Sequence, residues 1–172
     1  GESKSALLYL TGVSGTGKTS LISAYSTQYL KTDYKINTLI FRGVRVIFGS
    51  ELQIQNYFSV DDASLNNNIK ILIERAAALC EPARLLLIFD QFEELLINPT
   101  QRDSELRRVF ELIKQLIDNS STTNIRILLI IRSDYVGELQ QQILENRLPL
   151  LRMNENWAEL PPLRESDART ML

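Results

Sequence analysis

The chain has 172 residues, of which 44% are apolar and 23% charged, and its formal net charge is −2. This balance is typical of a globular domain with its own core, and it excludes collagen-like, disordered and disulfide-stapled chains. The single cysteine allows no disulfide within the chain, and the lack of histidine excludes Ser-His-Asp, Cys-His and His-zinc chemistry. The sequence shows neither the basic stripe of a nucleic-acid binder nor an apolar run that approaches a membrane span.

Short apolar runs alternate with amphipathic stretches along the chain, and this alternation predicts the fold class. Strands are predicted where an apolar run is bounded by glycine or polar residues, at 6–10, 36–41, 85–89, 125–131 and 157–160. Helices are predicted between them, at about 19–30, 69–80, 106–117 and 134–146. Strands that alternate with helices imply βαβ crossovers, so we expect an α/β fold whose parallel sheet is covered by helices on both faces.

Candidate helix caps precede two of these helices. Asp134 is a candidate N-cap for the helix at 134–146. The helix at 69–80 has three candidates, Asp61, Asp62 and Ser64. A further helix is expected from about residue 165, after a pair of prolines.

The first predicted strand runs into a glycine-rich segment that matches the pattern G-x-x-x-x-G-K-[ST] at every fixed position. We expect this segment and the residue after it to bind the phosphates of a nucleotide: Gly12, Val13, Ser14, Gly15, Thr16, Gly17, Lys18, Thr19 and Ser20. Glycines let backbone N–H groups wrap closely around a triphosphate, and the helix that follows points its N-terminal N–H groups at it. Lys18 is expected to bridge the β- and γ-phosphates, and the Thr19 hydroxyl to ligate Mg²⁺. The alternative is a glycine-rich turn without a ligand, which the preceding strand and the following helix disfavour.

The third predicted strand ends at Asp90, as a Walker B strand does. An aspartate at this position can hold Mg²⁺ through water. Glu93 or Glu94, a few residues later, is the candidate that orients or deprotonates the attacking water. The alternative for both glutamates is a place in the first turn of a helix, where the helix dipole favours acidic residues. The spacing does not choose between the two.

The fourth predicted strand ends at Arg132. The carboxyl ends of all strands of a parallel sheet face the same crevice, so Arg132 is expected to reach the γ-phosphate and to act in catalysis with Lys18 and a glutamate. The alternative for Arg132 is a salt bridge to Asp134 or to Glu93.

Together these residues resemble a STAND-class P-loop ATPase, and more narrowly the bacterial novel STAND family of the first type. The resemblance rests on the phosphate loop at 12–19, Asp-Gln-Phe-Glu-Glu-Leu at 90–95, Arg-Ser-Asp-Tyr at 132–135 and Pro-Pro-Leu at 161–163. The phosphate loop alone is unspecific among ATPases and GTPases, whereas the next two motifs at this separation are much more specific. The resemblance covers about residues 5–172 and is weakest between 44 and 64.

The resemblance implies a three-layer P-loop NTPase of the ASCE type, with a five-stranded parallel sheet in the order 5-1-4-3-2 and Arg132 as the sensor-one residue. It implies ATP and Mg²⁺ as ligands, and the lack of an Asn-Lys-x-Asp guanine-reading motif agrees with ATP rather than GTP. Family members are cytoplasmic switches, controlled by ATP and ADP, that act in signalling and in defence against stress or phage. Nucleic acid and membranes are not expected as partners.

The resemblance also implies partner modules. Residues 1–172 correspond to the nucleotide-binding core, and the family's helical lid, winged-helix, repeat-built sensor and effector modules are expected to lie outside this sequence. We therefore expect slow ATP hydrolysis by the core. Arginine fingers from neighbouring copies in a nucleotide-dependent homo-oligomer raise such rates by about 10³–10⁵-fold.

Three other functions are considered. A DNA-associated AAA-type ATPase normally has adjacent Asp and Glu after the strand, whereas Gln91 follows Asp90 here. A small-molecule P-loop kinase needs a basic lid, and no arginine-rich lid segment is evident. A non-enzymatic interaction module with a degenerate site would not bind nucleotide at all.

Overall fold

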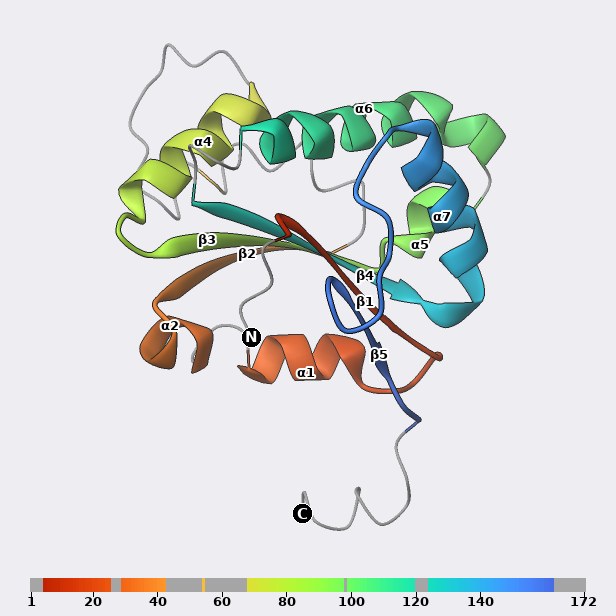
Figure 1. The fold of residues 1–172 in the computed structure, drawn as a ribbon, viewed down its shortest axis with the longest axis horizontal. Coiled ribbons are helices and arrows are strands. Elements are labelled where there is room, and N and C mark those ends of the chain that lie inside the picture. The colour runs from red at the N-terminus through yellow and green to blue at the C-terminus, as the bar shows by residue number, and fades with distance from the viewer. Residues whose placement is uncertain are drawn as a thin grey trace.

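Five parallel strands form a single twisted sheet at the centre of the molecule (Figure 1). The computed structural model describes residues 5–25, 29–42, 54, 68–97, 99–119 and 124–162. The strands are β1 (Leu7–Gly12), β2 (Ile36–Arg42), β3 (Arg84–Asp90), β4 (Ile125–Arg132) and β5 (Trp157–Leu160). Their order across the sheet is β2-β3-β4-β1-β5, and all neighbours are parallel. This confirms the predicted strands and the predicted order 5-1-4-3-2.

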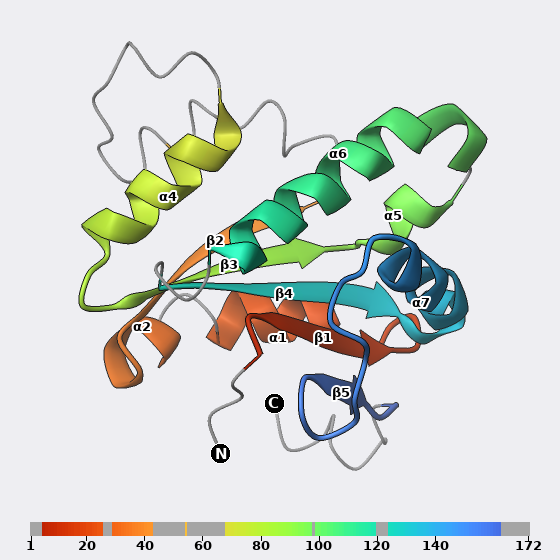
Figure 2. The ribbon, with the colours of Figure 1, turned by 45° about the horizontal axis from the view of Figure 1, so that its top comes forward.

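Helices cover both faces of the sheet and complete the three layers that the sequence predicts (Figure 1 and Figure 2). One face is covered by α1 (Lys18–Tyr25) and α2 (Tyr29–Asp33), and the other by α4 (Ile69–Leu79) and α6 (Pro99–Asp118). Three short elements lie near the carboxyl ends of β3 and β4, namely α5 (Glu93–Leu96), the 3₁₀ helix η2 (Ser133–Tyr135) and α7 (Val136–Glu145). No helix in the described part of the chain is long and apolar enough to cross a bilayer.

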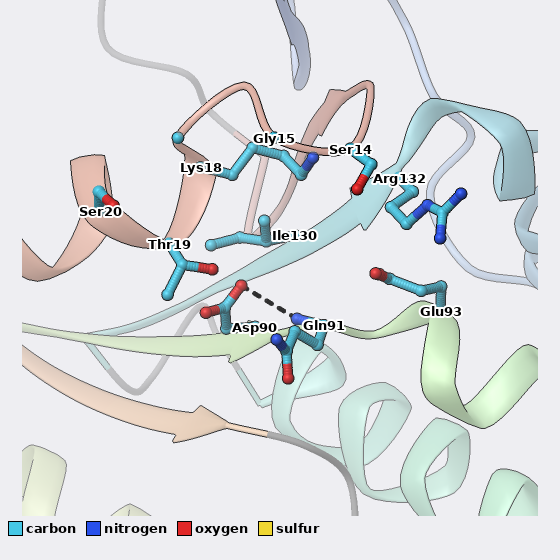
Figure 3. Close-up of a pocket in the computed structure, with 11 residues that line it drawn as sticks. Ser14, Gly15, Lys18, Thr19, Ser20, Asp90, Gln91, Glu93, Ile130 and Arg132 are labelled. Atoms are coloured by element: carbon cyan, nitrogen blue, oxygen red, sulfur yellow. Dashed lines mark hydrogen bonds between the residues drawn. The ribbon is translucent and has the colours of Figure 1, made fainter.

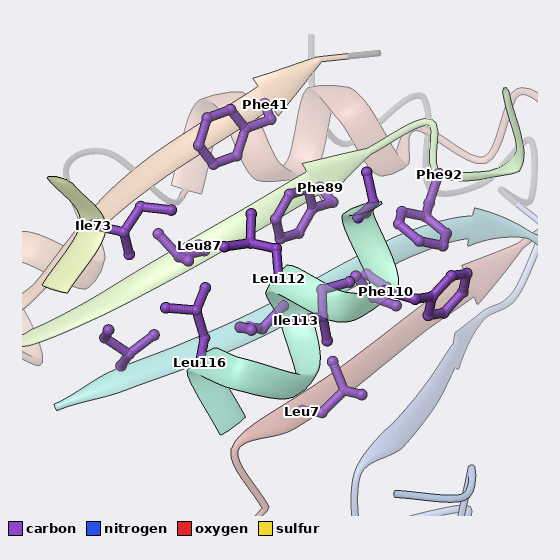
Figure 4. Packing of buried hydrophobic residues seen from close by; sticks show 14 of the residues in the cluster. Leu7, Phe41, Ile73, Leu87, Phe89, Phe92, Phe110, Leu112, Ile113 and Leu116 are labelled. Carbon is purple, nitrogen blue, oxygen red and sulfur yellow. The ribbon is translucent and has the colours of Figure 1, made fainter. Parts of the chain in front are cut away.

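A row of aromatic rings fills the core between the sheet and α6 (Figure 4). Phe41 of β2 stacks on Phe89 of β3 with 5.2 Å between ring centroids. Phe89 meets the edge of Phe92 at 6.4 Å, and Phe92 meets the edge of Phe110 of α6 at 5.7 Å. Such offset and edge-to-face pairs are favourable beyond the area they bury. Because Phe92 directly precedes α5, this packing also fixes the start of that helix at the end of β3.

The register of the sheet aligns the polar residues at the strand ends. Gly12 of β1 pairs with Arg132 of β4 on one side and with Leu160 of β5 on the other. Asp90 at the end of β3 pairs with Arg42 of β2. Parallel strands in this register present their terminal residues at one edge of the sheet, which is where the site forms.

Two predicted helices differ in extent from the observed ones. In place of the single helix expected at 19–30, the described residues form α1, which runs to Tyr25, and α2, which begins at Tyr29; residues 26–28 lie outside the described residues. The helix expected at 106–117 begins earlier, at Pro99. Proline suits the first helical position, and the polar residues that follow it carry no apolar periodicity by which to predict helix. The helix expected from residue 165 lies outside the described residues.

The predicted caps are also corrected. Asn68 caps α4, and its side chain accepts a hydrogen bond from the backbone N–H of Lys70 at 3.2 Å. The candidates Asp61, Asp62 and Ser64 lie outside the described residues. Asp134 does not cap α7, because its carboxylate binds Arg132 instead, and α7 begins by way of η2 with Tyr135 at its N-cap.

Candidate functional site

A pocket of about 330 Å³ opens at the carboxyl edge of the sheet, between the phosphate loop and the ends of β3 and β4 (Figure 3). Three segments of sequence line it, through Ser14, Gly15, Gly17, Lys18, Thr19, Ser20, Asp90, Gln91, Glu93, Ile130 and Arg132. Open α/β sheets bind ligands at this edge, because helix N-termini and strand ends converge there. The structure thus brings together the loop, Asp90, Glu93 and Arg132, which the sequence predicts as one site.

The phosphate loop is shaped mainly by backbone constraints. Gly15 and Gly17 have φ of 81° and 76°, a left-handed conformation that glycine adopts without strain. At Gly12 the constraint is space, because a Cβ atom there would lie 2.9 Å from Oγ1 of Thr16. The Thr16 hydroxyl donates to the carbonyl oxygen of Val13 at 2.9 Å. Gly12, Val13 and Thr16 therefore shape the loop rather than line the pocket.

Lys18 folds over its own loop. Its Nζ donates to the carbonyl oxygens of Gly12 at 2.7 Å and Val13 at 2.8 Å. Burial lowers the pKa of Lys18, and the positive charge of Arg132 lowers it further. The negative charge of the Glu93 carboxylate acts in the opposite direction and raises it. An ammonium group held by neutral carbonyl oxygens can turn to phosphate oxygens, which accept stronger, charge-assisted hydrogen bonds.

Thr19 and Asp90 face each other across the pocket (Figure 3). The Asp90 side chain is buried, with 3% of the residue exposed, and its Oδ1 accepts the backbone N–H of Gln91 at 3.0 Å. A buried carboxylate opposite a hydroxyl fits Mg²⁺, a hard cation that binds one or two protein oxygens and takes the rest from phosphate and water. The described residues contain no group of three or more His, Cys, Asp or Glu side chains suited to a metal, so an all-protein cage is not formed there.

The two glutamates after β3 occupy different environments. Glu93, the first residue of α5, points its carboxylate into the pocket, whereas Glu94 is exposed and does not line it (Figure 3). Oε2 of Glu93 is buried and has no hydrogen-bond partner within the described part of the chain. Burial raises the pKa of Glu93, and the backbone N–H groups of Glu93 and Arg132 and the charge of Lys18 oppose this. A buried carboxylate oxygen without a partner is an acceptor ready for a water molecule.

Arg132 lines the pocket with its guanidinium held by its neighbours. Its Nε and Nη2 donate to the two carboxylate oxygens of Asp134, at 3.1 Å and 2.5 Å. Its Cζ lies 5.5 Å from the centroid of the Tyr135 ring. This hydrogen bonding raises the pKa of Arg132 and lowers the pKa of Asp134. Of the two carboxylates considered as salt-bridge partners, the structure pairs Arg132 with Asp134.

The structure also adds residues that the sequence does not mark. Gln91 and Ile130 line the pocket, and Gln91 has a φ of 60° although it is not glycine. No sequence signal identifies a left-handed glutamine. Two contacts join β5 to its neighbours beside the site. Trp157 Nε1 donates to Thr11 Oγ1 of β1 at 3.0 Å, and the Ser133 hydroxyl of η2 donates to a Glu159 carboxylate oxygen at 2.8 Å.

The sequence model of the family described as Novel STAND NTPase 1 matches residues 2–172. The chain belongs to this family. No curated protein is similar enough to this STAND chain to count as a match.

Solved structures similar to this STAND chain share its fold at low sequence identity. The ORC2 protein of Aeropyrum pernix matches 97% of this chain with a TM-score of 0.64 and 13% identity. Domain III of the replication initiation protein DnaA of Thermotoga maritima matches 98% with a TM-score of 0.58 and 15% identity. A Walker-type ATPase of Pyrococcus abyssi matches 95% with a TM-score of 0.57 and 14% identity. The STAND chain spans 45%, 60% and 51% of those chains, respectively. At this identity the likeness shows the fold alone, a five-stranded parallel sheet flanked by helices.

Proposed function

We propose that this chain is the ATP-binding and ATP-hydrolysing core of a STAND signalling switch. One observation carries the proposal: a single pocket joins the phosphate loop to a buried carboxylate facing Thr19 and to Glu93, whose Oε2 is buried without a partner within the described residues. Membership of an NTPase family supports hydrolysis as the reaction. The lack of an Asn-Lys-x-Asp motif supports ATP over GTP.

In this proposal, the phosphate loop and the start of α1 bind the triphosphate of ATP. Ser14, Gly15, Gly17, Lys18, Thr19 and Ser20 line the pocket and hold the triphosphate, while Gly12, Val13 and Thr16 keep the loop in shape around it. Backbone N–H groups at the start of α1 surround the phosphates, and Lys18 turns from its carbonyl partners to the β- and γ-phosphate oxygens. Thr19 and Asp90 hold Mg²⁺, which when bound neutralises charge on the phosphate oxygens.

In this proposal, residues at the ends of β3 and β4 carry out hydrolysis. Glu93 accepts a proton from a water molecule through its unpartnered Oε2. The water oxygen forms a bond to the γ-phosphorus, the bond from that phosphorus to the β,γ-bridging oxygen breaks, and ADP and inorganic phosphate leave. Arg132 donates to the γ-phosphate oxygens as their charge develops. Glu94, exposed outside the pocket, takes no part in the reaction.

The remaining parts of the proposal concern the whole protein. Residues 1–172 act as the core of a cytoplasmic switch whose lid, winged-helix, repeat-built sensor and effector modules respond to the bound ATP or ADP, in bacterial signalling against stress or phage. The isolated core turns over slowly, and nucleotide-dependent homo-oligomers supply arginine fingers that raise the rate.

A second candidate is a DNA-associated AAA-type ATPase. The similar folds of ORC2 and of a DnaA domain favour it. Two observations favour the switch instead: Gln91 rather than glutamate follows Asp90, and the net charge is −2 without a basic stripe. Stimulation of ATP hydrolysis by duplex or single-stranded DNA would support the second candidate.

The proposed site is tested by calorimetric titration of the chain with ATP, ADP and GTP in the presence of Mg²⁺, beside Lys18→Ala. We expect adenine-selective binding that Lys18→Ala weakens by at least about 10²-fold, because the variant loses its charge-assisted contacts to two phosphates. Equal binding of GTP would contradict the choice of ATP. Unchanged binding by Lys18→Ala would contradict the site itself.

A further inference from the structure

Gln91 has an unusual backbone conformation at the edge of the pocket. Its φ is 60°, in the left-handed region, which residues other than glycine rarely adopt and which asparagine and aspartate tolerate best. The described residues include three other non-glycine residues with positive φ, Lys35, Arg147 and Asn154. All three are exposed and none lines the pocket. A strained residue is maintained only where its surroundings hold it, and such residues cluster at functional sites.

The hydrogen bonds around Gln91 show what this conformation does. Its backbone N–H donates to Oδ1 of Asp90 at 3.0 Å, and its carbonyl oxygen accepts the backbone N–H of Glu94 at 3.1 Å. The next N–H, that of Phe92, donates to the carbonyl oxygen of Ile130 in β4 at 3.0 Å. The chain therefore leaves the line of β3 within one residue and starts α5 directly beside the pocket.

The turn distributes the side chains of Asp90, Phe92 and Glu93 between the pocket and the core. The Asp90 carboxylate is held at the floor of the pocket, the Phe92 ring is fully buried between Phe89 and Phe110, and Glu93 points into the pocket (Figure 3 and Figure 4). An extended residue at position 91 would instead carry the chain onward along β3, at about 3.3 Å per residue, away from the phosphate loop.

The amide of Gln91 is not needed for this arrangement. The residue is exposed, and Figure 3 shows its amide directed away from Lys18. The contacts that organise the turn come from its backbone N–H and carbonyl groups. The backbone conformation of Gln91, rather than its side-chain chemistry, is therefore the feature tied to the site.

We infer that Gln91 is a positioning residue of the nucleotide site: its left-handed backbone sets the Asp90 and Glu93 carboxylates on the same side, facing the phosphate loop. The catalytic part of this inference rests on the proposed function, since it concerns the two carboxylates assigned there to Mg²⁺ and to the attacking water. The structural part, the placement of Glu93 in a buried setting, stands independently of whether ATP is hydrolysed.

A series of substitutions at one position tests the inference. Gln91→Gly and Gln91→Asn tolerate positive φ, Gln91→Ala tolerates it less, and Gln91→Val, being β-branched, tolerates it least. Lys35→Val is the matched control, because Lys35 has a φ of 52° and lies outside the pocket. Each protein is measured for ATP turnover, for ATP affinity, and for the pH titration of the Glu93 carboxyl carbon by NMR without nucleotide.

We expect turnover to rank Gly and Asn above Ala, and Ala above Val, with Gln91→Val at least about tenfold below wild type. ATP affinity should change less than about threefold across the series, because the phosphate loop is untouched. The Glu93 pKa, which burial raises in the wild type, should fall toward its ordinary range in Gln91→Val as the side chain reaches water. Lys35→Val should match the wild type in all three measurements.

Two results would overturn the inference. One is a Gln91→Val protein that keeps both wild-type turnover and the wild-type Glu93 titration. The other is a series in which turnover follows the presence of a side-chain amide, so that Gln91→Asn is active whereas Gln91→Gly and Gln91→Ala lose activity equally. If the wild type hydrolyses no ATP, the proposed function fails, and the Glu93 titration across the series still decides whether residue 91 places that carboxylate.

Discussion

The two halves of the pocket are built in different ways. The loop half is one continuous segment, in which the left-handed Gly15 and Gly17 and the crowded Gly12 shape the backbone. The strand-end half joins Asp90 and Arg132, which lie far apart in the sequence and meet because β3 and β4 are adjacent parallel strands. The loop half depends on short-range sequence, and the strand-end half depends on the correct pairing of the sheet.

This difference suggests that the loop half binds the nucleotide and the strand-end half catalyses its hydrolysis. Backbone N–H groups and one lysine suit binding, because they fit a phosphate in both ATP and ADP. The strand ends bring the charged side chains of Asp90, Glu93 and Arg132 to the pocket, and such groups suit metal binding, proton transfer and stabilisation of developing charge. We therefore expect substitutions in the loop to change affinity and substitutions at the strand ends to change turnover or the distinction between ATP and ADP. The first three predictions below test that division and the fourth tests the burial of Glu93, beginning with the largest expected effect.

Asp90→Asn should lower ATP turnover by about 10²-fold while changing ATP affinity much less, because the amide weakens the hold on Mg²⁺. The fold should persist, since the asparagine oxygen can still accept the N–H of Gln91 that Oδ1 accepts now. A magnesium titration of turnover is the measurement. A normal magnesium dependence in the variant would remove Asp90 from the metal site.

Gly12→Ala should weaken ATP binding by about tenfold, because the added Cβ would lie 2.9 Å from Thr16 Oγ1 and 3.1 Å from the carbonyl oxygen of Leu160. Gly137→Ala is the matched control, since a Cβ there meets nothing within 4 Å in the described structure. Calorimetry on both variants makes the comparison. Equal affinity in the two proteins would show that the loop has room to adjust.

Asp134→Asn should reduce the preference for ATP over ADP by about two- to fivefold, because Arg132 loses the partner that orients its guanidinium. The effect is small because the pair is exposed, with 38% and 54% of the two side chains accessible. The ratio of the Kd values for ADP and a non-hydrolysable ATP analogue is the readout. Glu155→Gln, which removes the exposed Arg152–Glu155 pair, is the control. An increased preference would show that Asp134 competes with the γ-phosphate for Arg132.

Glu93→Gln should raise the melting temperature by about 1–4 °C at pH 7–8. Burial raises the pKa of Glu93, so the folded state binds its proton more tightly than the unfolded chain does. That contribution to stability is present below the ordinary glutamate pKa of about 4.3 and is lost as the pH rises through the raised value. The advantage of Glu93→Gln should therefore vanish below about pH 4 in thermal melts. An advantage that persists at low pH would point to packing instead.

The sequence predicted the features that depend on local patterns. Apolar runs locate the first four strands, the short fifth strand is expected near Trp157 to Leu160, and the family resemblance supplies the order of all five. The sequence leaves open the features that depend on competition between nearby side chains. It offers Asp134 both as a helix cap and as a salt-bridge partner of Arg132, and the structure forms the bidentate pair with Arg132. Glu93 rather than Glu94 lines the pocket, and we infer that the left-handed turn at Gln91, which no residue pattern encodes, places it there.

The division between binding and chemistry is tested most directly by a single-turnover experiment with γ-labelled ATP on Glu93→Gln and Glu94→Gln. Bound and cleaved nucleotide are measured in the same samples. We expect Glu93→Gln to bind ATP within about threefold of the wild type and to cleave it at least about 10²-fold more slowly, while Glu94→Gln cleaves it at close to the wild-type rate. Cleavage by Glu93→Gln at the wild-type rate, or a loss confined to Glu94→Gln, would contradict the assignment of Glu93.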